Sequence, residues 1–103
     1  MNIKKLMYGI SEDKFFGDNF DIELDYPDDN EFTVSSKSDI DLLLGCSVVM
    51  SVKLHGFDQV YVKFGNDYSN HMNLVYATDV FNMDKFINWL KCSLRDFLWQ
   101  KSN

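Results

Sequence analysis

Two histidines and two cysteines, His55, His71, Cys46 and Cys92, are the residues best suited to catalysis or metal binding. The histidines could act as general acid and base on RNA. Both lie beside predicted turns, however, and an acidic protein repels a polyanionic substrate. The four potential zinc ligands include no pair at the short spacing of a structural zinc site. The carboxylate-rich stretch 25–31 lacks the central glycine and terminal glutamate of a calcium-binding EF-hand loop. We therefore predict no enzymatic activity, no metal and no cofactor.

The strongest pattern is an unbroken alternation of apolar and acidic residues from Phe20 to Tyr26. Successive side chains of a strand point to opposite faces, so the pattern predicts a half-buried strand over residues 19–26. The apolar members are predicted to face the core: Phe20, Ile22, Leu24 and Tyr26. The acidic members are predicted to face solvent: Asp21, Glu23 and Asp25. Like charges on one strand face repel each other, so a purely acidic row favours a binding function. A plain solvated face, or protection of a sheet edge, is the competing interpretation.

Negative charge is concentrated around this stretch. Residues 17–45 hold nine acids against Lys37 alone, a net charge of −8, and the rest of the chain carries +2, which gives −6 for the whole. Such a surface attracts a basic partner and disfavours direct binding to nucleic acid or anionic lipid. Tryptophan is enriched among binding hot spots, so we add one tryptophan near the C-terminus. The predicted partner-binding residues are Asp18, Asp21, Glu23, Asp25, Asp28, Asp29, Glu31, Asp39, Asp41 and Trp99.

Length and composition indicate one folded domain spanning residues 1–103. The chain is 46% hydrophobic and 16% aromatic, which is enough to form a core and argues against disorder. The apolar run after the first lysines is too short for a secretory signal, and none approaches the roughly 20 residues of a membrane span. Two cysteines are too few for a disulfide framework. We therefore expect a cytoplasmic protein with two buried thiols.

The first half of the chain predicts short elements around the acidic strand. Apolar residues at helical spacing predict a helix over 3–10 that Gly9 could close, followed by a short turn over 11–14 and a second turn at 17–19. Residues 27–30 read as a hairpin loop, and 31–35 as its second strand. Ser38 is predicted to cap a helix over 39–44 that ends at Gly45. A buried strand through Leu42–Leu44 is the alternative.

The second half predicts a meander and a long helix. Alternating apolar residues indicate strands over 48–54, 59–64 and 72–76, joined by short connections that favour antiparallel pairing. From Met83 to Leu98 apolar residues follow a helical stripe, with Asn82 as the N-cap. The predicted fold class is α+β: an antiparallel sheet of four to five strands, a long C-terminal helix packed on one face, and short N-terminal and central helices.

In size, acidity and α+β pattern across the whole chain, the sequence resembles the bacterial immunity proteins that neutralise nuclease toxins, including those of contact-dependent growth inhibition systems and colicins. The resemblance implies an antitoxin that forms a 1:1 complex with the nuclease domain of a cognate toxin, an RNase or tRNase. The acidic row would occupy the cationic cleft of the toxin or lie beside it.

The alternative is a phage-encoded inhibitor, either an anti-CRISPR protein or an anti-restriction mimic of nucleic acid. Carboxylates on alternate residues of a strand are about 6.8 Å apart. Duplex DNA carries a charge about every 1.7 Å of its axis. The spacing therefore disfavours mimicry of duplex DNA. A toxin gene directly upstream would support immunity, whereas a phage operon would support the alternative.

Overall fold

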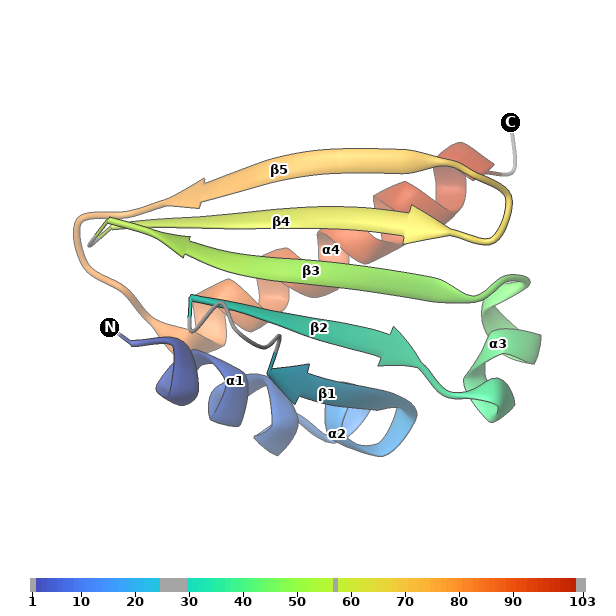
Figure 1. Cartoon of the computed structure of the whole chain (residues 1–103), viewed down its shortest axis with the longest axis horizontal. Helices are drawn as coiled ribbons and strands as arrows, with labels where there is room; N and C mark the ends of the chain where they lie inside the picture. Colours follow the sequence, from blue (N-terminus) through green and yellow to red (C-terminus); the bar gives the residue numbers. More distant parts are fainter. Residues whose placement is uncertain (1, 25–29, 57, 102–103) are drawn as a thin grey trace.

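The computed structural model describes residues 2–24, 30–56 and 58–101 as one α+β fold (Figure 1). Its elements in chain order are α1 (Ile3–Glu12), α2 (Lys14–Asn19), β1 (Phe20–Leu24), β2 (Glu31–Ser36), α3 (Ser38–Leu44), β3 (Val48–His55), β4 (Gln59–Asn66), β5 (His71–Ala77) and α4 (Met83–Lys101). The five strands form one sheet in the order β1-β2-β3-β4-β5. Every neighbouring pair is antiparallel, so the predicted meander and fold class are confirmed.

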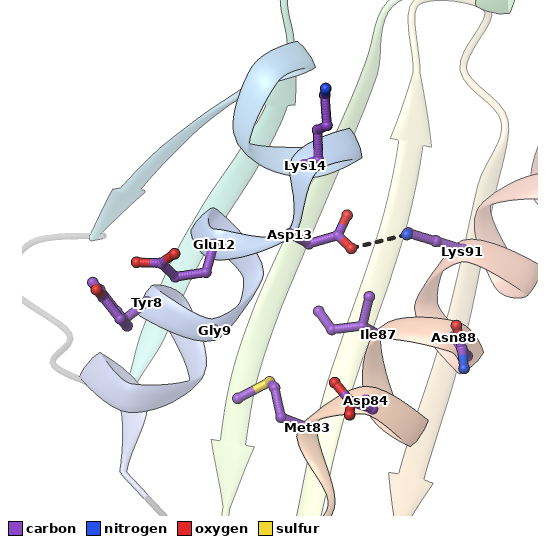
Figure 2. A pocket seen from close by; sticks show the side chains of 10 residues that line it. All are labelled: Tyr8, Gly9, Glu12, Asp13, Lys14, Met83, Asp84, Ile87, Asn88 and Lys91. Carbon is purple, nitrogen blue, oxygen red and sulfur yellow. Dashed lines mark hydrogen bonds and ion pairs between the residues drawn. The ribbon is translucent and has the colours of Figure 1, made fainter.

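The core lies between one face of the sheet and the helices that cover it. Helix α4 runs across that face, with α1 and α2 beside it (Figures 1 and 2). Val52 and Val62 are register partners in β3 and β4, and both are buried. Phe64 of β4 meets Phe97 of α4 with 5.6 Å between ring centroids. The side chains that alternate with these point to the other face, which no helix of the described chain covers. One face of the sheet is therefore buried against the helices, and the other is exposed to solvent.

Helix α4 begins where the sequence predicts. The side chain of Asn82 accepts a hydrogen bond from the Lys85 amide at 3.0 Å, as expected for an N-cap. Asp84 in the first turn favours the positive end of the helix dipole. A polar residue at the cap and an apolar stripe after it are therefore sufficient to define this helix.

The N-terminal segment differs from the prediction. Gly9 does not end α1, which continues to Glu12. The Met83 side chain packs where a Cβ of residue 9 would lie. The predicted turn at 17–19 belongs to α2, whose N-cap Asp13 accepts a hydrogen bond from the Phe16 amide at 3.1 Å. Both glycines therefore serve close packing rather than chain reversal.

Strand β1 confirms the predicted alternation but is less covered than expected. Phe20 is buried and Ile22 is half-buried, whereas Leu24 is 36% exposed. The prediction that Leu24 faces a closed core is wrong, because β1 is an edge strand and its far end extends beyond the covering side chains. Tyr26, the last apolar member of the pattern, lies outside the described residues.

Helix α3 replaces the alternative strand through Leu42–Leu44. It ends at Gly45, which adopts the left-handed conformation with φ 79° and donates its amide to the Asp41 carbonyl at 2.9 Å. The predicted Ser38 cap is wrong: Ser38 is already helical, and Lys37 occupies the N-cap without a side-chain cap. Polar contacts of Asp41, described below, hold this helix in place instead.

Replacing Gly17 with Ala should destabilise the protein, although Ala is the better helix former by about 1 kcal/mol. A Cβ on Gly17 would collide with the backbone carbonyl oxygen of Ser11, which cannot rotate away. We expect a loss of about 1–3 kcal/mol in urea unfolding. The control Asp18→Ala, at the next and exposed helix position, should stay within about 0.5 kcal/mol. An unchanged or raised stability of Gly17→Ala would contradict this packing.

Candidate functional site

Four exposed carboxylates lie on three adjoining elements, and we call them the acidic surface: Asp18 of α2, Asp21 and Glu23 of β1, and Asp39 of α3. The end of α2 meets the start of α3, because the Lys37 amide donates to the Asn19 carbonyl at 2.9 Å. Strand β1 continues directly from α2. The carboxylates therefore lie on elements that follow one another or are joined by this backbone bond.

Asp21 and Glu23 project from the uncovered face of the sheet, as the alternation predicts. Their register partners on β2 are Ser35 and Thr33, which carry no charge. The third member of the predicted row, Asp25, lies outside the described residues, as do Asp28 and Asp29. The orientation of the row is thus confirmed for its first two members.

The charge of the side chains on the uncovered face changes from negative to positive toward the centre of the sheet. Glu31 is half-buried and stands opposite Lys53 across β2 and β3, so its charge has a cationic neighbour. Lys63 of β4 is exposed further along the sheet. We therefore leave Glu31 out of the acidic surface, which is confined to the β1 edge and to the adjoining helices.

Asp41 belongs to a hydrogen-bond network inside the protein. One carboxylate oxygen accepts from the Ser36 hydroxyl, and the other accepts from the Ser47 hydroxyl at 2.8 Å. The Ser36 oxygen in turn accepts from the Val48 amide at 2.9 Å. The network ties α3 to the end of β2 and the start of β3. Asp41 thus has a structural contact that sequence reasoning could not foresee, and we leave it out of the acidic surface.

Trp99 is 71% exposed in the last turn of α4. Helix α4 ends beside the β4–β5 turn, and α3 lies at that same end of the sheet (Figure 1). Sequence reasoning missed Leu42 and Leu43 of α3, which are also exposed. The spacing offered a signal, because Ile40 and Leu44 are four residues apart and share one helical face, which leaves the intervening leucines on other faces.

The histidines are separated by the length of the sheet. His55 pairs with Gln59 at one end of β4, and His71 pairs with Gly65 at the other, about 20 Å away. The His55 ring stacks on Tyr61 with 4.8 Å between centroids. Within the described ranges, no three His, Cys, Asp or Glu side chains are grouped so as to hold a metal ion. The two histidines therefore cannot share one substrate as an acid–base pair.

A groove of about 580 Å³ lies between α1 and α4 (Figure 2). One oxygen of Asp13 accepts from the Lys91 ammonium group at 2.9 Å, and the other caps α2. Hydrogen bonding from the Tyr8 hydroxyl to the Glu12 carboxylate, and the negative charge of that carboxylate, raise the pKa of Tyr8. These polar groups thus join helices or neighbouring turns.

Comparison of the chain with models of protein families, with curated proteins and with solved structures gave no match. Among the described residues, no helix has the length and apolar character needed to cross a membrane.

Proposed function

We propose that this protein binds a basic protein and blocks it, and that the target is the nuclease domain of a bacterial toxin encoded by the neighbouring gene. The protein would then act as the immunity protein of the producing cell. The observation that carries the proposal is the acidic surface, whose four carboxylates are exposed on α2, β1 and α3. The core of the chain does not require these four carboxylates, since all four side chains are exposed.

A nuclease is a fitting target because it must hold a polyanionic substrate and therefore presents a cationic surface. Carboxylates fixed on a strand and two short helices complement such a surface and exclude the nucleic acid that needs it. Asp21 and Glu23 lie on the uncovered sheet face, so a partner can approach them without displacing any described helix. The complex is 1:1 in this proposal, and we expect an RNase or tRNase.

Kinetics offer a test with purified components. We expect this chain to associate at least tenfold more slowly with the protein encoded by the neighbouring gene at about 150 mM salt than at about 20 mM salt. The reason is that salt screens the charges that steer encounter. The dissociation rate constant should change much less. Surface plasmon resonance at several salt concentrations measures both. An association rate indifferent to salt would contradict electrostatic steering, and absence of binding at every salt concentration would overturn the proposed function.

A further inference from the structure

Two neighbouring leucines of α3 are almost fully exposed. Leu42 is 87% exposed and Leu43 is 83% exposed, whereas Ile40 is buried and Leu44 is half-buried. Helix α3 thus has one apolar side that anchors it to the core and a second that no part of the described chain covers. Isolated exposed leucines are common on protein surfaces, but two adjacent ones on a seven-residue helix form a projecting apolar patch.

The backbone that carries these leucines is fixed. The carboxylate of Asp41 accepts from Ser36 at the end of β2 and from Ser47 just before β3, as described above, and the Asp41 amide donates to the Lys37 carbonyl at 3.1 Å. At the other end, Gly45 closes the helix. A backbone held in this way loses little additional freedom on binding, which favours a tight contact with a partner.

Three exposed carboxylates lie on α3 or on segments bonded to its two ends, and exposed Lys37 occupies its N-cap. Asp39 is exposed on the same helix, and Asp18 lies on α2, which is joined to α3 by the backbone bond from Lys37 to Asn19. Exposed Asp67, in the β4–β5 turn, accepts a hydrogen bond from the Ser47 amide at 3.2 Å, just beyond the end of α3. An apolar centre with a charged rim is the anatomy of a protein–protein interface. Three carboxylates against the single lysine at the N-cap give this rim a net negative charge, so the partner surface that fits it is basic.

We propose that Leu42 and Leu43 insert into an apolar pocket bordered by Lys or Arg side chains on the basic partner. This inference rests on the proposed function and places the energetic centre of that interface on α3. The carboxylates would then mainly steer encounter, and the leucines would mainly slow dissociation, as buried apolar anchors do.

The test compares Leu42→Ala/Leu43→Ala with wild type, using the neighbouring-gene protein on the sensor surface. We expect the dissociation rate constant to rise at least tenfold, by a factor that is the same at low and high salt. Alanine keeps the helical preference of α3, so the thermal midpoint should stay within about 2 °C. The double variant Leu42→Gln/Leu43→Gln should show the same rise in the dissociation rate constant. Agreement between the two double variants guards against a result caused by misfolding of one of them. The control is Val80→Ala, which removes an 81% exposed apolar side chain after β5 and should change nothing.

The outcomes separate the two proposals. If wild type binds and both leucine variants dissociate at the wild-type rate, this inference falls and the proposed function stands. If wild type does not bind the neighbouring-gene protein, both fall. If the wild-type chain forms dimers in the absence of a partner and the leucine variants stay monomeric, a second copy of the chain covers the patch, and the assignment to a basic partner is overturned.

Discussion

Neutralising the acidic surface is expected to weaken the complex with the basic partner at least tenfold and to leave the fold intact. The variant Asp18→Asn/Asp21→Asn/Glu23→Gln removes three exposed carboxylates while keeping side-chain size. Loss of rim charges slows association, and loss of a charge that pairs in a dry contact costs about 2–5 kcal/mol. Stability should stay within about 0.5 kcal/mol of wild type or rise slightly, since like charges no longer repel. Isothermal titration and one melting curve measure both quantities.

A matched control separates local charge from total charge. The variant Asp58→Asn/Asp79→Asn/Asp96→Asn removes the same number of exposed carboxylates from the β3–β4 turn, the β5–α4 loop and α4. It should bind within about threefold of wild type, because it changes only the long-range field, which salt screens. Equal losses in both variants would show that net charge alone matters. If the acidic-surface variant bound as tightly as wild type, the acidic surface would have no role in binding.

Truncating Phe16 to Ala is expected to cost about 3–5 kcal/mol of unfolding free energy, a large share of the stability of a domain this size. Phe16 is completely buried, and its ring lies 5.2 Å from that of Phe15 and 5.4 Å from that of Phe20. The substitution would leave a cavity where α2 meets β1. Urea unfolding followed by tryptophan fluorescence measures the loss.

Phe15 provides the comparison, because it is the same residue type one position earlier. Its ring is half-buried and borders a shallow apolar groove with Leu44, Leu94 and Leu98. Phe15→Ala should cost about 1–2 kcal/mol, since less apolar surface returns to water. Similar losses at the two positions, or a larger loss at Phe15, would contradict the packing of α2.

Regular patterns made much of the fold predictable. The alternation in 48–54 and 59–64 fixed which side chains of β3 and β4 are buried, and the apolar stripe after Asn82 fixed α4. Gly9 and Gly17 misled the prediction, because glycine reads as a helix breaker in isolation. In the fold, a Cβ at Gly9 would collide with the Met83 side chain, and a Cβ at Gly17 would collide with the Ser11 carbonyl group. The first of these partners is far away in sequence, so local pattern could not reveal it.

The candidate site was predictable where it depends on strand periodicity. Asp21 and Glu23 face outward because their neighbours Phe20 and Ile22 face inward, a relation visible in the sequence. The role of Asp41 depends on Ser36 and Ser47, which reach it only once β2, α3 and β3 are assembled. The exposed leucines were missed because apolar residues in a short helix are ordinarily assigned to the core.

Titrating the nuclease activity of the neighbouring-gene protein with this purified chain tests most directly whether the chain is a toxin inhibitor. The proposed function predicts that RNA cleavage falls in proportion to added chain and reaches zero at one chain per nuclease. The acidic-surface variant should need a marked excess to reach the same inhibition, whereas the matched control should not. Undiminished cleavage at a large excess of wild-type chain, or cleavage of RNA by the chain alone, would contradict the proposed function.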